Sequence, residues 1–189
     1  MTTKENKLEK SKGHSLEVII ITTGGTIDKS YDEFDGSLSN RETQLKNLIL
    51  SGLRLPNTYL HIFSVMSKDS LFMTDYDRTL LVKTIQKQMA KNQPIVVLHG
   101  TDSMAKSAEF CFKEIQNPNV PVIFTGAMKP MGFQDSDAKQ NVTEALLAAG
   151  LVAPGFYISF HNKVFTVPGV TKNIEKGTFE ALGKNGKPI

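Results

Sequence analysis

Short runs of aliphatic and β-branched residues recur along the chain, separated by stretches in which apolar residues repeat with a helical period. The continuous runs are typical of strands buried on both faces, and the periodic stretches are typical of amphipathic helices. The expected strands are Val18–Ile21, Tyr59–Val65, Ile95–Leu98 and Val120–Phe124, with a hairpin over Phe156–Val167 that turns at Asn162-Lys163. The expected helices cover residues 43–53, 74–93, 103–115 and 137–149, and residues 28–39 are expected to form a loop. This alternation predicts an α/β fold with a Rossmann-like, mainly parallel sheet flanked by helices and a C-terminal β-hairpin.

The length and composition favour a single globular domain. The chain has 189 residues, of which 40% are hydrophobic and 22% charged, enough to bury one core. We expect a flexible polar tail over residues 1–15, an α/β domain over 16–180 and a second flexible tail over 181–189.

The net charge of +3 is concentrated at the N-terminus, where residues 1–14 hold four lysines against two glutamates. The remaining body is nearly neutral, which argues against a nucleic-acid-binding face. The single cysteine, Cys111, lies in an apolar stretch and is expected in the core, and it implies no oxidising compartment. Because no apolar run reaches membrane-spanning length, we expect no membrane contact and a cytoplasmic location.

Three of the expected strands end in glycine-containing polar turns. These are Thr23-Gly24-Gly25-Thr26, His99-Gly100-Thr101-Asp102 and Thr125-Gly126. In open α/β sheets, ligands bind outside the carboxyl ends of the strands, and glycine lets backbone N–H groups approach a ligand closely. One such turn is usually only a tight connection, but three turns with hydroxyls and a carboxylate favour a functional site.

The residue types at these turns favour hydroxyl chemistry. The spacing matches neither a dinucleotide-binding motif nor a P-loop, and the four histidines lack metal-ligand spacing, so we expect no cofactor and no metal. A threonine hydroxyl becomes a useful nucleophile only when a neighbouring group removes its proton. The candidate pairs are Tyr31 with Thr26, and Lys172 and Asp102 with Thr101.

Five segments, in their order along the chain, resemble the bacterial L-asparaginase/glutaminase family. They are Ile21–Ile27, Asp69-Ser70 with Met73, Val97–Met104, Thr125–Pro130 and Val170–Asn173, and together they span roughly residues 16–175. The family usually has threonine where Ser103 stands. Either threonine segment alone is a moderately specific sign of the family, whereas the five segments together, in the family's order, are a strong one.

The resemblance implies a set of catalytic residues. Thr26 would be the nucleophile that attacks a side-chain amide, with Tyr31 assisting it. Thr101, Asp102 and Lys172 would form a second, proton-relaying group. The products would be aspartate and ammonia.

The resemblance also implies how a small-molecule substrate is bound. Asp102 would hold the α-amino group of L-asparagine, Ser70 its α-carboxylate, and the Ala127 carbonyl its side-chain amide. The implied substrate-binding residues are Gly25, Ser70, Gly100, Thr101, Asp102 and Ala127.

Two departures from the family pattern leave alternatives open. Most of the family is about twice as long and has a second, smaller domain, so the chain resembles a short, single-domain branch, and Phe72 stands where the pattern usually has aspartate. We expect an L-asparaginase in preference to a glutaminase, and a homo-oligomer, either a dimer or a tetramer. The alternatives are an asparagine- or aspartate-binding module and an amidotransferase-type subunit that releases ammonia for a partner.

Overall fold

The computed structural model describes residues 15–24, 29–31, 38–40, 52–183 and 185–187. The predicted N-terminal tail and the predicted helix over residues 43–53 lie outside these ranges, except for their last one or two residues. Within the described part of the chain, no helix is long and apolar enough to cross a bilayer.

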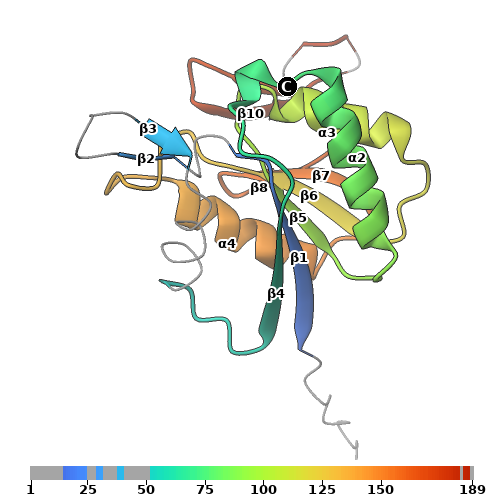
Figure 1. Ribbon diagram of the computed structural model, residues 1–189. Coiled ribbons are helices and arrows are strands. Elements are labelled where there is room, and N and C mark those ends of the chain that lie inside the picture. Colours follow the sequence, from blue (N-terminus) through green and yellow to red (C-terminus); the bar gives the residue numbers. More distant parts are fainter. Residues whose placement is uncertain (1–14, 25–28, 32–37, 41–51, 184, 188–189) are drawn as a thin grey trace, which may run out of the picture.

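A six-stranded sheet forms the centre of the molecule (Figure 1). Its strands, in spatial order, are β4 (Thr58–Ser64), β1 (Leu16–Thr22), β5 (Ile95–Leu98), β6 (Pro121–Thr125), β7 (Gly155–Phe160) and β8 (Lys163–Thr166). The pairs from β4 to β7 are parallel, and β8 runs antiparallel to β7. The predicted α/β class with a mainly parallel sheet is confirmed.

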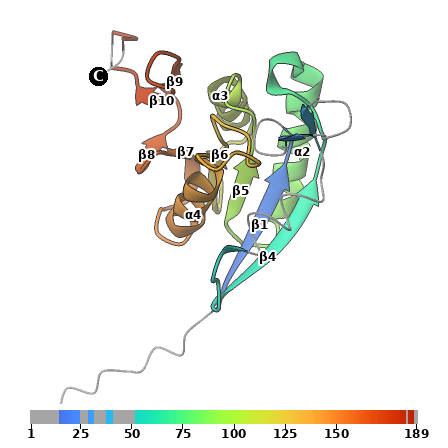
Figure 2. The same ribbon diagram turned by 90° about the vertical axis from the view of Figure 1, so that its left-hand side faces the viewer.

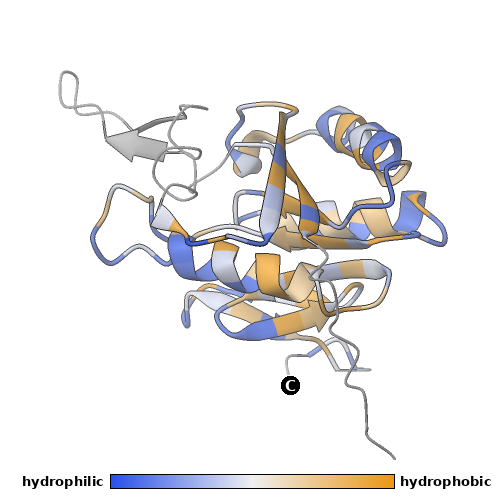
Figure 3. Ribbon diagram, turned by 90° about the horizontal axis from the view of Figure 1, so that it is seen from below, coloured by the Kyte–Doolittle hydropathy of each residue, from blue (hydrophilic) through white to orange (hydrophobic). Residues whose placement is uncertain are grey.

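Helices cover both faces of this sheet (Figure 2). α2 (Asp75–Met89) and α3 (Met104–Glu114) lie on one face, and α4 (Ala138–Ala149) lies on the other. The β-branched run of β1 explains the arrangement: Ile19 and Ile21 enter the cluster under α2 and α3, and the alternating residues enter the cluster under α4. Hydropathy follows these layers, with hydrophobic residues gathered on the central strands (Figure 3).

The turn between β7 and β8 lies one residue earlier than predicted. His161 and Asn162, rather than Asn162 and Lys163, form the two-residue loop, with φ values of 46° and 62°. Two successive residues with positive φ are what a tight hairpin turn of this twist requires, and asparagine tolerates that conformation better than lysine does.

Two small sheets lie outside the central one. β9 (Val170–Asn173) pairs antiparallel with β10 (Thr178–Ala181), and β2 (Lys29–Tyr31) pairs antiparallel with β3 (Leu38–Asn40). The second pair lies where the sequence predicted a loop. The first pair was not predicted, and hydrogen-bonded structure continues beyond it, because the Leu182 N–H donates to the Gly169 carbonyl.

Candidate active site

The carboxyl ends of three neighbouring strands meet at one edge of the sheet. Thr22 of β1 is in register with Leu98 of β5, and Leu98 is in register with Thr125 of β6. Two further backbone hydrogen bonds continue this register into the turns, from the Thr23 N–H to the Leu98 carbonyl and from the His99 N–H to the Thr125 carbonyl. The three predicted glycine turns therefore begin at neighbouring positions in space.

Glycine is required in two of these turns because backbone from another segment lies against it. A β-carbon added to Gly24, which has a φ of +91°, would lie 2.4 Å from the Lys68 backbone nitrogen. A β-carbon added to Gly126 would lie 2.2 Å from the His99 carbonyl oxygen. Each glycine thus lets two turns approach one another more closely than any side chain would permit.

Thr101, Asp102 and Lys172 form one contacting group, called here the lysine group. The Lys172 ammonium donates to Thr101 Oγ1 over 2.9 Å and to Asp102 Oδ1 over 2.6 Å. Thr101 is buried, whereas the Lys172 and Asp102 side chains are 21% and 40% exposed. The arrangement leaves the hydroxyl proton of Thr101 free to be donated elsewhere, as a proton relay requires.

Lys172 reaches this edge on the β9–β10 hairpin, which is anchored in the core. Val170 is buried beside α3, and Phe179 lies directly opposite Lys172 in the β9–β10 pair. The Phe179 ring is 1% exposed and packs edge-on against Phe160, with ring centroids 5.0 Å apart. Burial of an aromatic side chain opposite the lysine sets the position of its backbone.

Ser70 lies in a 3-10 turn, η4 (Ser70–Phe72), that is tied to the second glycine turn. The Ser103 hydroxyl donates to the Ser70 carbonyl over 2.6 Å. Ser70 is only 2% exposed, and its Oγ has no hydrogen-bond partner among the described residues. A buried hydroxyl without a partner is costly, and a polar ligand bound at this edge would complete its bonding. Phe72, two residues further on, is 70% exposed.

His99 and Cys111 are buried and unreactive. Burial lowers the pKa of His99 to about 4, and its Nδ1 lies 2.8 Å from the Gly100 carbonyl, so the ring is neutral and held in place within the turn. Burial raises the pKa of the Cys111 thiol to about 12. Neither residue is suited to act as a base or nucleophile at neutral pH.

The turn over residues 125–129, called here the Ala127 turn, is supported by residues that the sequence analysis did not single out. The Asp137 carboxylate accepts hydrogen bonds from the Met128 and Lys129 N–H groups, and the Asn141 amide donates to the Gly126 carbonyl over 2.9 Å. Burial acts to raise the pKa of Asp137, but hydrogen bonds from these backbone groups and from His161 outweigh it and hold the pKa below its ordinary value. The carboxylate is therefore ionised at neutral pH.

The structure brings together most of the predicted site. Thr101, Asp102 and Lys172 are in contact, and Ser70 is joined to their turn through Ser103. Gly100 and the buried Ala127 belong to adjacent turns at the same edge. Thr26 and Gly25 lie outside the described residues, and of Tyr31 only the backbone, in β2, is described.

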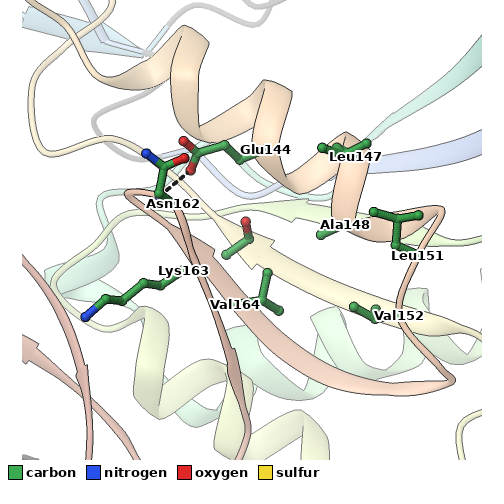
Figure 4. Close-up of a pocket in the computed structure, with 9 residues that line it drawn as sticks. Glu144, Leu147, Ala148, Leu151, Val152, Asn162, Lys163 and Val164 are labelled. Atoms are coloured by element: carbon green, nitrogen blue, oxygen red, sulfur yellow. Dashed lines mark hydrogen bonds between the residues drawn. The ribbon is translucent and has the colours of Figure 1, made fainter.

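A cavity of about 220 Å³ lies elsewhere, between α4 and β8 (Figure 4). Its walls are largely aliphatic, and none of the predicted site residues contributes to them. The residues that line it are Glu144, Leu147, Ala148, Leu151, Val152, Ser159, Asn162, Lys163 and Val164. The chemistry-bearing groups are thus at the carboxyl edge of the sheet and not in this cavity.

Among the described residues, no group of three or more His, Cys, Asp or Glu side chains is placed to hold a metal ion.

The fold and the lysine group together define a Rossmann-like α/β domain with a threonine, a carboxylate and an amine at its carboxyl edge. Residues 17–185 match the family described as asparaginase, N-terminal, and the chain belongs to that family.

Individual relatives are similar over part of their length. The L-asparaginase of Thermococcus kodakarensis is 28% identical over 160 residues, which make up 83% of this chain and 48% of that protein. The 60 kDa lysophospholipase of Mus musculus is 35% identical over 116 residues, 59% of this chain and 21% of that protein. The chain therefore spans about half, or less, of the length of these relatives.

A solved structure agrees in fold. The thermostable L-asparaginase from Thermococcus kodakarensis superposes with a TM-score of 0.80 at 24% identity, covering 92% of this chain and 56% of that one.

Proposed function

We propose that this chain is an amidohydrolase that converts L-asparagine to L-aspartate and ammonia through a threonine nucleophile. The observation that carries the proposal is the lysine group, in which one ammonium contacts both Thr101 Oγ1 and Asp102 Oδ1. Membership of the asparaginase N-terminal family supports it, because the five family-like segments include Thr26 and every residue of the lysine group.

The reaction proceeds in two halves. Thr26 Oγ attacks the side-chain carbonyl carbon, the C–N bond breaks, and the nitrogen leaves as ammonia after gaining a proton. Water then hydrolyses the resulting ester, which releases aspartate and restores the Thr26 hydroxyl. Thr101, Asp102 and Lys172 move the protons that these steps require, and Tyr31 assists Thr26.

Substrate binding uses polar groups of neighbouring turns. Ser70 Oγ, buried and without a partner among the described residues, binds the α-carboxylate, and the partly exposed Asp102 carboxylate binds the α-amino group. The Ala127 carbonyl accepts a hydrogen bond from the side-chain amide, and Gly25 and Gly100 bring backbone N–H groups close to the substrate.

L-Asparagine is the proposed substrate in preference to L-glutamine, although a single methylene separates two substrates by only about 1–3 kcal/mol even in an apolar pocket. The protein is further proposed to be cytoplasmic and to act as a homo-oligomer, dimer or tetramer. Light scattering tests the assembly, with a particle of two or four chains expected and a monomer contradicting it.

The test of function is ammonia release by the purified protein from L-asparagine and, separately, from L-glutamine. Thr26→Ala and Lys172→Ala variants are measured beside it, with Lys163→Ala, an exposed lysine of β8, as the matched control. We expect turnover of asparagine by the wild type and the control and its loss in both site variants. Folded wild-type protein that binds asparagine in calorimetry without releasing ammonia would establish the binding-module alternative instead, and turnover confined to glutamine would favour the glutaminase or amidotransferase alternative.

A further inference from the structure

His161 contacts residues that hold the Ala127 turn and a residue of the hairpin that carries Lys172. Its Nε2 lies 2.9 Å from Asp137 Oδ2, and its Nδ1 lies 3.1 Å from Thr178 Oγ1. Its backbone N–H donates to Asn141 Oδ1 over 3.2 Å. One residue of the β7–β8 turn is therefore bonded both to the residues behind the Ala127 turn and to the hairpin that carries Lys172.

Asp137 determines the direction of the Ala127 carbonyl. The Met128 N–H, which donates to Asp137 over 3.0 Å, belongs to the same peptide plane as the Ala127 carbonyl. In a planar trans peptide the N–H and the C=O point in opposite directions, so the bond to Asp137 turns the Ala127 oxygen away from that carboxylate. The Asn141 amide holds the preceding carbonyl, that of Gly126, over 2.9 Å, so both sides of Ala127 are held.

Thr178 connects the histidine to the lysine group. Thr178 of β10 is paired with Asn173 of β9, one position from the pair formed by Phe179 and Lys172. A hydrogen bond at Thr178 therefore restrains the hairpin within one residue of Lys172 along the pairing.

The turn that carries His161 is itself fixed to α4. The Asn162 N–H donates to Glu144 Oε2 over 2.8 Å, the bond marked in Figure 4, and the Phe160 ring lies with its centroid 4.4 Å from that of His161. Because Asp137 accepts, Nε2 is the donor of that bond, and Nδ1 faces a hydroxyl that can either donate or accept. The imidazole, 32% exposed, is thus placed to bridge both partners.

We propose that His161 is a positioning residue that couples the Ala127 carbonyl to the Lys172 hairpin, so that the amide-binding and proton-relaying parts of the site keep one relative geometry. This inference rests on the proposed amidohydrolase function. The residue acts through Asp137 and Thr178 and does not itself touch the substrate.

The experiment compares two replacements of similar size at one position. His161→Leu removes both polar contacts, whereas His161→Gln retains a donor for Asp137 and an acceptor for Thr178. Thr178→Val breaks only the contact to the hairpin with nearly unchanged shape. Thr143→Val removes an exposed hydroxyl on α4 that bonds only within its own helix and is the matched control.

In ammonia release from L-asparagine, we expect kcat to fall about 10- to 100-fold for His161→Leu and Thr178→Val, because small displacements of reacting groups have effects of this size. The Michaelis constant should change less than about 3-fold, since the groups that bind the α-carboxylate and the α-amino group remain. His161→Gln should recover most of the lost kcat, and Thr143→Val should behave as the wild type. Wild-type kcat in His161→Leu, or a loss that glutamine does not restore, would overturn the proposal.

Hydrogen exchange separates failure of this inference from failure of the proposed function. His161→Leu should speed amide hydrogen exchange both in peptides covering residues 126–129 and in peptides covering residues 170–181. Thr143→Val should change the exchange rate of neither set of peptides. A wild type that releases no ammonia refutes the proposed function and with it the positioning of that active site by His161. Unchanged exchange in His161→Leu refutes the bridge itself, whatever the activity.

Discussion

The lysine group and the Ala127 turn lie at the same edge of the sheet but are supported in different ways. The lysine group consists of side chains from two distant segments joined by two hydrogen bonds, and Asp102 and Lys172 are partly exposed. The Ala127 turn is held by a partly buried network of more bonds, in which Asp137 alone accepts from two backbone N–H groups and two side chains. The comparison suggests that the lysine group contributes mainly to chemistry, whereas the turn network contributes to both chemistry and stability.

The largest expected effect is on activity and comes from the lysine group. Lys172→Met should lower kcat for asparagine by about 10³-fold, because the proton-relaying amine is lost. Its ion pair is partly exposed, so the free energy of unfolding should change by about 1 kcal/mol or less. Urea denaturation and ammonia release measure the two quantities on the same sample, with Lys163→Met as the control. A large loss of stability would show that the lysine group has a structural role, and it would then not differ from the Ala127 turn in this respect.

The next largest effect is on stability and comes from the turn network. Asp137→Ala leaves the Met128 and Lys129 N–H groups without their acceptor, and we expect it to lower the free energy of unfolding by about 3 kcal/mol. Asp135→Ala removes a carboxylate that is 68% exposed and paired with Lys129, and it should leave the free energy of unfolding nearly unchanged. Equal stability of the two variants in urea would contradict the structural role of Asp137.

A third change tests the close approach of the turns themselves. In Gly126→Ala the new β-carbon would meet the His99 carbonyl, and we expect a loss of about 2 kcal/mol from the resulting strain. Gly132→Ala is the matched control, because a β-carbon there has no atom within 4 Å. Thermal denaturation should show a lower Tm for the first variant only, and similar values for both would mean that the turns can separate without cost.

The smallest effect concerns the capping box at the start of α2, which Thr74 and Asp77 form. The hydrogen bond from Lys68, followed by those from the Thr74 backbone and hydroxyl, lowers the pKa of Asp77 from 3.8 to about 2. A depressed carboxyl pKa adds stability that is present above about pH 4 and is lost as the pH falls toward 2. Asp77→Asn should therefore cost at most about 1 kcal/mol at pH 7 and less at pH 2.5, since the site is accessible to water. Urea denaturation at the two pH values would refute this if the cost were the same at both.

The central sheet could be predicted because its strands are continuous runs of β-branched and aliphatic residues. β5 and β6, for example, are buried along their whole length, and runs of four and five such residues are too short for a typical helix. The β9–β10 hairpin escaped prediction because its strands have four residues each and Val-Thr-Lys-Asn shows no alternation. Its pairing depends on Phe179 entering the core, which is a tertiary contact.

The candidate site could be predicted only in part from the sequence, because it too depends on tertiary contacts. Glycine and hydroxyl residues after predicted strands indicated the edge, but residue types made Lys172 only a candidate partner of Thr101, 71 residues away, and the family resemblance supplied the pairing. Asp137 precedes a helix and has a residue type typical of an N-cap, yet it makes no side-chain cap bond and instead accepts from the preceding turn. Its bond to His161, 24 residues away, has no local sequence signal.

A double-mutant cycle tests most directly whether Thr101 and Lys172 act as one chemical group. Thr101→Val, Lys172→Met and the double variant are compared with the wild type in kcat/KM for L-asparagine. If the lysine acts through the Thr101 hydroxyl, the double variant should be about as active as the less active single variant, because the second change removes nothing further. Losses that multiply would mean that the two side chains act independently and would contradict the account.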